Sequence, residues 1–335
     1  MQTIIVTGAS GFAGTHTVAA LAKRKDVRLI IACRDFSKIK IDLNAESRLG
    51  DLRDPEYRQN LLKGVDVVCH CASWSSLFGH KNESAALYLQ PTLALMSDAK
   101  QAGVKRWINV STTSAAAPDR SSDAMSVGIE RHFWPHLVNV VKIENQLRDM
   151  ADDNFHVMNL RFGIFAGQHY GLGVLPILVP RLKTHLVPWM NGGSTSLPVI
   201  DGRDVGQAMA LAATAKNKLP YEGFNIVGPD IPSMRQVIGF LHQEYGLPMP
   251  HFTVPFAIAY RFAALMEWLD SYVPWAPLVT RSIVHLLEEV NIDNAYAQQR
   301  LNYRPQYHWQ QAIREQMREM AVRQTQNMPM ALPVR

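Results

Sequence analysis

Short apolar runs alternate with helical patterns along most of the first two thirds of the chain. Each run is rich in β-branched residues, which is typical of strands that are buried on both faces of a parallel sheet. Between the runs, apolar residues recur with helical spacing. This alternation predicts an α/β protein with a doubly wound parallel sheet and helices on both faces. We expect strands at residues 3–6, 27–32, 47–50, 65–70, 107–110, 157–162, 197–200 and 224–228.

The first apolar run leads directly into a glycine-rich turn, Thr7-Gly8-Ala9-Ser10-Gly11-Phe12-Ala13-Gly14, and then into an Ala-rich helix. Strand, glycine turn and helix in this order are typical of a dinucleotide-binding loop. Gly8 would let the chain turn off the strand, Gly11 would let the backbone approach a pyrophosphate, and Gly14 would let helix and strand pack closely. The N–H groups that begin the helix would face the phosphates.

The spacing Gly-x-x-Gly-x-x-Gly after a threonine resembles the extended short-chain dehydrogenase/reductase family, in its epimerase/dehydratase and 3β-hydroxysteroid dehydrogenase-like branches. The resemblance spans nearly the whole chain and implies a Rossmann sheet with a smaller C-terminal substrate lobe. We expect a dinucleotide-binding domain at residues 1–168, with a returning segment near 201–228. Residues 169–200 and 229–323 would form the substrate lobe, and residues 324–335 a tail.

The residues after the second predicted strand bear on the choice of cofactor. The side chain at this point meets the adenosine ribose in such folds. Arg34 stands first, and its guanidinium can pair with a 2′-phosphate, which favours NADP. Lys38 would add a second cation, whereas Asp35 keeps NAD as the less favoured alternative.

The resemblance implies further cofactor contacts at the ends of the other strands. Asp51, followed by Leu52, would accept a hydrogen bond from the adenine amino group. The segment after the fourth strand would pass under the ribose and phosphates, and main-chain atoms after the sixth strand would contact the nicotinamide amide. These candidate positions are His70, Cys71, Ala72, Ser73, Val110, Phe162, Gly163 and Ile164.

The catalytic residues are where the chain departs from the family. The resemblance implies that Thr112, with Thr113 as the near alternative, donates to the substrate oxygen, and that Lys142 holds the nicotinamide ribose. The family's tyrosine stands four residues before that lysine, where this chain has Val138. Valine transfers no proton, and no tyrosine occurs between Tyr88 and Tyr170.

Three interpretations of this departure stay open. The chain has lost the hydride chemistry, another group supplies the proton, or the helix register is wrong. The substitutes are His132, His136, Tyr170 or the substrate itself. His132 precedes the helix on a loop from which it could reach the cleft, whereas His136 points away from the face of Val138.

The second lobe is poor in charge. Residues 171–181 and 252–290 are largely apolar. The second of these segments predicts a pair of helices packed on the core. As an alternative, one face of the pair lines an apolar pocket.

The net charge of +5 comes without a long basic run, so we expect no nucleic-acid partner. Three cysteines show no metal-ligand spacing, and no apolar stretch is long enough to span a membrane. We expect a cytoplasmic protein that forms a homodimer through the apolar run at residues 137–141.

These observations favour an NADP(H)-dependent oxidoreductase that acts on a hydrophobic carbonyl or alcohol with an atypical active site. The first alternative is a non-catalytic NADP(H)-binding sensor or partner-binding protein. The second alternative is an epimerase or dehydratase of the nucleotide-sugar type, which is less favoured because those reactions also use the tyrosine.

Overall fold

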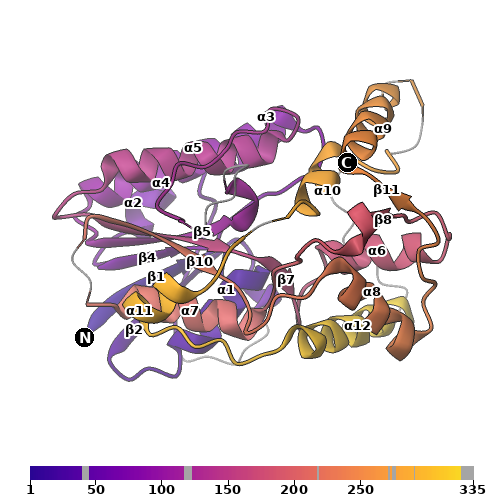
Figure 1. Cartoon of the computed structure of the whole chain (residues 1–335). Coiled ribbons are helices and arrows are strands. Elements are labelled where there is room, and N and C mark those ends of the chain that lie inside the picture. Colours follow the sequence, from indigo (N-terminus) through magenta and orange to yellow (C-terminus); the bar gives the residue numbers. More distant parts are fainter. Residues whose placement is uncertain are drawn as a thin grey trace.

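The protein is built on a seven-stranded parallel sheet with the order β10-β6-β5-β4-β1-β2-β3 (Figure 1). The computed structural model describes residues 1–39, 45–116, 123–216, 219–270, 272–273, 277–289 and 291–325. The strand order reverses between β1 and β4, and ligands of doubly wound sheets bind at the carboxyl ends of the strands beside such a point. The predicted α/β class is therefore confirmed.

The strands are β1 (Gln2–Thr7), β2 (Val27–Cys33), β3 (Glu46–Leu49), β4 (Val67–His70), β5 (Arg106–Thr112), β6 (His156–Phe162), β7 (Ile164–Ala166), β8 (Trp189–Met190), β9 (Val199–Asp201), β10 (Tyr221–Ile226) and β11 (Thr253–Val254). The α-helices are α1 (Phe12–Leu21), α2 (Pro55–Leu61), α3 (Lys81–Ser84), α4 (Gln90–Gln101), α5 (Pro135–Met150), α6 (Val174–Leu182), α7 (Gly202–Thr214), α8 (Met234–Tyr245), α9 (Phe256–Leu269), α10 (Arg281–Leu286), α11 (Ala295–Leu301) and α12 (Trp309–Thr325). Short helical turns are η1 (Phe36–Lys38), η2 (Ala85–Leu89), η3 (Thr113–Ala115) and η4 (Asn191–Gly193).

Helices cover both faces of the sheet. The side chains of α2, α4 and α5 form one core with the sheet, and α1, α7 and α11 form a second core on the opposite face (Figure 1). Successive buried residues within a strand alternate between these two cores, as the two-residue period of a strand requires. A third core joins α6, α8, α9 and α12 beside the sheet. The pairs β11-β8 and β7-β9 complete this region.

Two further expectations from the sequence need correction: one long helix from Glu83 to Ala102, and Asp204 as the N-cap of a helix from Val205 to Ala215. The helical segment instead contains the π-helical turn η2 between α3 and α4, and Pro91 is the second residue of α4. Proline has no N–H and clashes with the carbonyl four residues earlier, which explains the π-helical turn. Asp204 does not cap α7: Asp201 is the N-cap and accepts from the Arg203 N–H at 2.8 Å. Asp204 lies inside the helix and accepts from main-chain N–H groups of the 306–307 segment.

A buried polar network fixes α5 against the sheet. Glu144 on α5 forms an ion pair with Arg161 on β6, with an N–O distance of 2.6 Å, and each side chain is about 1% exposed. Ser111 on β5 donates to the same carboxylate at 2.5 Å, and Asn159 on β6 donates to it at 2.8 Å. Because a buried carboxylate needs all of these partners, the rotation of α5 about its axis is determined by Glu144.

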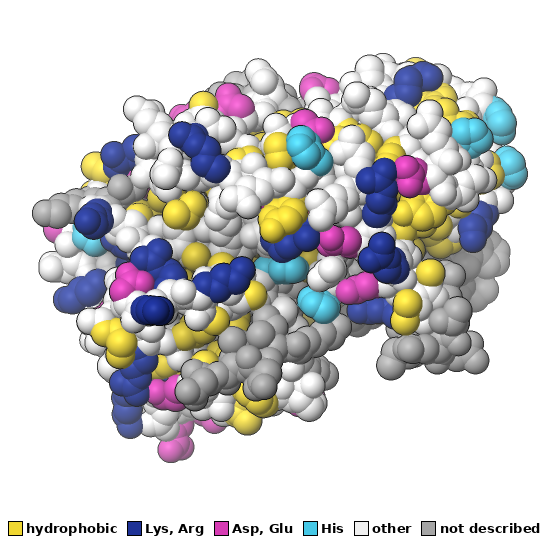
Figure 2. Space-filling model, turned by 90° about the horizontal axis from the view of Figure 1, so that it is seen from below, with side chains coloured by type: hydrophobic (Ala, Val, Ile, Leu, Met, Phe, Trp, Pro, Cys, Tyr) yellow, Lys and Arg dark blue, Asp and Glu magenta, His cyan; other side chains and the backbone are white. Residues whose placement is uncertain are grey.

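No helix in the described part of the chain is long and apolar enough to cross a membrane. On the face seen in Figure 2, Lys and Arg side chains are interleaved with acidic, polar and hydrophobic ones. The described ranges also hold no cluster of His, Cys, Asp and Glu that could bind a metal ion.

Candidate functional site

The glycine turn after β1 is held in a conformation that only small residues allow. Gly8 has φ +63°, and a Cβ there would lie 2.5 Å from the Ala72 Cα at the end of β4. A Cβ on Gly14 would lie 2.1 Å from the Gly8 carbonyl oxygen. Gly8 and Gly14 are therefore required by close packing within the protein itself.

Gly11 has a different role. It is exposed, its φ is −81°, and a Cβ there would meet only the Gly8 oxygen, at 3.2 Å. Gly11 also begins α1 without a side-chain cap, so the first N–H groups of that helix are left for a ligand. An open backbone surface at a helix N-terminus can accommodate the pyrophosphate of a dinucleotide, which is the ligand that the sequence predicts at this point.

The end of β2 presents an arginine rather than a free carboxylate. Arg34 is exposed directly after β2. The neighbouring Asp35 caps η1 and accepts from the Ser37 N–H at 3.0 Å and from its hydroxyl at 2.6 Å. Lys38 is the last residue of η1, and its side chain lies outside the described part of the structure.

Asp51 lies beyond β3, close enough to Arg34 for their charges to interact. Arg53 donates to the Asp51 carboxylate through Nη2 at 2.7 Å and Nε at 3.0 Å, and the bound guanidinium lowers the pKa of Asp51 to about 2. Asp51 is thus ionised at neutral pH and is an acceptor, as its expected contact with adenine requires. Leu52 is half-buried and its carbonyl accepts from Arg58 at 2.9 Å.

The segment after β4 lies directly beside the glycine turn. Ala72 contacts Gly8, Ser73 is exposed, and Cys71 is half-buried with its N–H donated to the Thr7 carbonyl at 3.1 Å. His70 differs, because its two ring nitrogens contact the hydroxyls of Thr7 at 2.9 Å and Thr92 at 3.2 Å. Burial lowers the pKa of His70 to about 4, so its imidazole is a neutral core group.

At the end of β6, some main-chain N–H groups are already donated within the protein and are not available to a ligand. The Gly163 N–H is donated to the Ile226 carbonyl at 3.0 Å, and the Ile164 N–H is donated to the Pro198 carbonyl at 2.7 Å. The Phe162 side chain is buried in the core. A nicotinamide amide at this point would therefore have to donate to carbonyl oxygens rather than accept from these two N–H groups.

At the end of β5, the pleat of the strand determines where side chains point. Val110 packs in the core shared with α1 and α7, and Thr112 follows two residues later, opposite the buried Phe162. Ser111 points to the other face and bonds to Glu144. Thr112 is thus on the opposite side of the sheet from α5, and its hydroxyl accepts from the Ser114 N–H at 3.2 Å.

Lys142 is not brought together with Thr112, contrary to expectation. Val141 packs against Ala115 just after β5, and Glu144 bonds to Ser111. Since each helical residue advances by about 100°, Lys142 and Val138 fall on the side of α5 turned away from this contact. Lys142 is exposed there.

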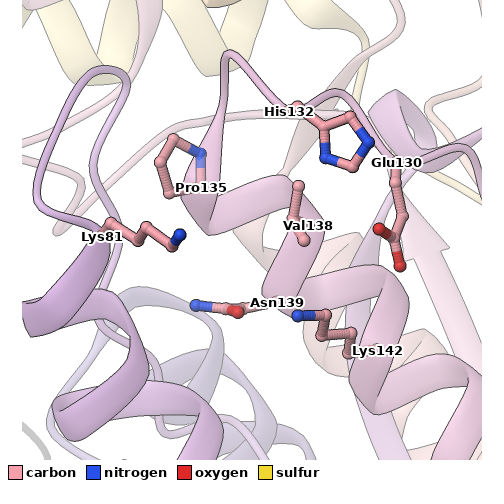
Figure 3. Close-up of a pocket in the computed structure, with 7 residues that line it drawn as sticks. All are labelled: Lys81, Glu130, His132, Pro135, Val138, Asn139 and Lys142. Carbon is pink, nitrogen blue, oxygen red and sulfur yellow. The ribbon is translucent and has the colours of Figure 1, made fainter.

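Lys142, Val138 and His132 instead surround an outer hollow of about 230 Å³, shown in Figure 3. None of the residues that line it comes from the glycine turn or from a strand end: Lys81, Glu130, His132, Pro135, Val138, Asn139 and Lys142. His132 is exposed on its loop and lines this hollow.

The residues of α5 that face inward near the carboxyl edge are His136, Leu137, Val140 and Val141. None of them is a tyrosine or a lysine. His136 packs against the ring of Tyr88 in η2, with ring centroids 5.1 Å apart, and its Nδ1 has no partner among the described residues. Burial lowers the pKa of His136 to about 4 and raises that of Tyr88, so both are neutral at pH 7.

Two other expectations change with the same geometry. Leu137, Val140 and Val141 are buried within the protomer, so of the apolar side chains in the run at 137–141 only the half-buried Val138 is left for the expected dimer contact. Tyr170 packs on Phe12, with ring centroids 4.5 Å apart, and burial raises its pKa to about 12. A tyrosine with a raised pKa is a weak candidate for the missing base.

Sequence reasoning missed Glu144 and Tyr88. The signal for Glu144 was a carboxylate in the middle of an apolar helix face, together with an arginine inside a buried strand. Tyr88 carried no such signal, because an aromatic residue on a helix is usually a core residue and its contact with His136 depends on η2.

Comparisons with known proteins agree with this geometry. Residues 4–227 match the model of the NAD dependent epimerase/dehydratase family. The chain is 24% identical over 316 residues to 4-hydroxy-2-methyl-3-oxo-4-farnesyl-3,4-dihydroquinoline-1-oxide ketoreductase of Stigmatella aurantiaca, with 92% of this chain and 93% of that protein covered.

Two solved structures share the fold. The crystal structure of gox2253 superposes with a TM-score of 0.74 at 22% identity, covering 98% of this chain and 100% of the other. A UDP-glucose-4-epimerase of Stenotrophomonas maltophila, with bound NAD and formylated UDP-arabinopyranose, gives a TM-score of 0.72 at 17% identity, covering 97% and 100%. With its glycine turn, its strand order and the family match over most of its length, this chain belongs to the NAD dependent epimerase/dehydratase family.

Proposed function

We propose that the protein is an NADP(H)-dependent oxidoreductase that acts on a hydrophobic carbonyl or alcohol. The observation that carries the proposal is the open backbone at Gly11, at the N-terminus of α1 and at the carboxyl edge of the sheet. The N–H groups that begin α1 would hold the pyrophosphate, and Arg34 would pair with the 2′-phosphate. When bound, the nicotinamide supplies or accepts the hydride.

The preference for NADP rests on two neighbouring side chains. Asp35 has its carboxylate engaged with Ser37, which leaves it poorly placed to accept from both ribose hydroxyls. Arg34 is exposed beside the ionised Asp51 and can turn to a phosphate in fork geometry. Asp51, Leu52 and the segment from Cys71 to Ser73 would line the adenosine half.

A hydrophobic substrate is supported by the second lobe and by the ketoreductase relative. The apolar core cluster of the second lobe includes Leu175 and Val179 of α6, which lie within the largely apolar segment 171–181. The relative's name describes a farnesyl-bearing ketone as the compound reduced. Thr112 and Thr113 at the end of β5 are the hydroxyls proposed to meet the substrate oxygen.

A second candidate is a protein that binds NADP(H) without catalysis. The observation that favours it is the inward face of α5, which has neither the tyrosine nor the lysine of the family. General acid–base catalysis contributes about 10²- to 10⁴-fold to a rate, so its loss would leave slow turnover.

The first test is cofactor binding followed by turnover. Titration with NADPH, followed by nicotinamide fluorescence, should saturate for the wild type. Gly11→Ala should fold normally, because φ −81° suits alanine, but should bind NADPH at least about tenfold more weakly, since its methyl group occupies the phosphate approach. Gly14→Ala is the contrasting variant, because its Cβ clashes within the protein and lowers the melting temperature.

The same preparations should then be screened with hydrophobic ketones and aldehydes for loss of NADPH absorbance. Turnover by the wild type that is reduced in Gly11→Ala at a subsaturating NADPH concentration supports the oxidoreductase. NADPH binding without turnover supports the second candidate, and failure to bind either nicotinamide cofactor contradicts both.

The cofactor preference should depend on Arg34. We expect Arg34→Ala to weaken NADPH binding by about tenfold or more, because a charge-assisted pair with the 2′-phosphate is lost. NADH binding should change little. Equal losses for both cofactors, or none for NADPH, would show that Arg34 does not recognise the 2′-phosphate.

The pH dependence tests the role of His136. Its pKa near 4 lies below that of a free imidazole, so the side chain stays neutral as the pH rises from 5 to 8. Any ketone reduction should therefore show no histidine inflection from this residue. An inflection near pH 6–7 that disappears in His136→Phe, with His132→Phe as the exposed control, would contradict this assignment.

A further inference from the structure

The outer face of α9 is an unusually apolar surface. The helix buries Ala259, Ala263 and Glu267 against its own lobe. The opposite side exposes a run of large side chains with helical spacing, and Trp268 is 61% exposed. The exposed positions of α9 are Ala257, Ile258, Arg261, Phe262, Leu265 and Trp268.

Neighbouring segments extend this surface along the chain. Phe252 before the helix and Tyr272 after it are exposed, as is Leu278 just before α10. The rings of Trp268 and Tyr272 pack together with centroids 5.1 Å apart. We call the exposed side chains among the described residues 252–270, 272–273 and 277–278 the α9 surface.

The exposed charge on α9 is positive. Among its described positions on the helix, the only exposed charged side chain is Arg261. Glu267 is buried and forms an ion pair with Arg281 at 2.6 Å, so its charge is compensated inside the lobe. The whole chain carries a net charge of +5. An apolar face with a cation and no exposed carboxylate on the helix complements an anionic, apolar partner.

We propose that the α9 surface binds the interface of an anionic lipid bilayer. Trp and Tyr place an apolar ring in lipid while their polar atoms stay at the headgroups. Arg261 would contact lipid phosphate, while Ile258, Phe262 and Leu265 enter the acyl boundary, as in helices that lie in the plane of a membrane. α9 lies at the end of the molecule away from the sheet (Figure 1), so a flat surface can reach it.

Lipid binding at α9 does not depend on the cofactor reaction. It would give α9 a role at the surface, whereas the sequence predicted either a core helix or the wall of a substrate pocket. Lipid binding would also bring the second lobe to the phase in which a hydrophobic substrate dissolves.

The test is flotation with lipid vesicles, without cofactor or substrate. Wild-type protein should float with vesicles of phosphatidylcholine and phosphatidylglycerol, and less with phosphatidylcholine alone. The double variant Phe262→Ser, Trp268→Ser should lose at least about tenfold in partitioning, because two large side chains no longer enter the lipid. Tyr245→Ser, an exposed aromatic residue of α8, is the matched control and should bind as the wild type does.

Melting curves of each variant show whether a loss of lipid binding comes from misfolding. NADPH titration of each variant shows whether cofactor binding, and with it the proposed function, is unaffected. No flotation of the wild type with either vesicle would overturn the proposal. So would a wild-type dimer that the double variant converts to a monomer, because a second copy of the chain would then cover this face.

Discussion

The ion pair between Glu144 and Arg161 is the interaction on which the site depends. Two charges that are almost fully excluded from water are tolerated only with well-made hydrogen bonds, and here Ser111 and Asn159 complete them. These partners lie on β5 and β6, so the pair holds α5 against the sheet at a single rotation. Any other rotation would leave a buried charge without partners, which proteins rarely tolerate.

That rotation divides the site into a part that follows the family and a part that does not. The glycine turn, the end of β2 and the segment after β4 form a surface suited to a dinucleotide. The helix that carries the family's proton-transfer residues instead directs His136 and apolar side chains inward. Lys142, which the sequence suggested as the lysine of the family's tyrosine–lysine pair, lines an outer hollow.

The strands and the glycine turn could be predicted because their signals are local. A β-branched run reports a buried strand, and Gly8 and Gly14 report close backbone contacts that no other residue allows. The rotation of α5 about its axis could not be predicted from local signals, because it is determined by Arg161 and Ser111, which lie in other segments. The cap of α7 was misassigned for a related reason, since Asp204 serves the distant 306–307 segment.

The orientation of α5 is tested most directly by the NADPH dissociation constant of Lys142→Met. We expect a value within about twofold of the wild type, because an exposed side chain outside the cleft contributes little to binding. Weakening by about tenfold or more would mean that Lys142 donates a charged hydrogen bond to the cofactor. That result would contradict the orientation of α5 and restore the lysine to the family's catalytic arrangement.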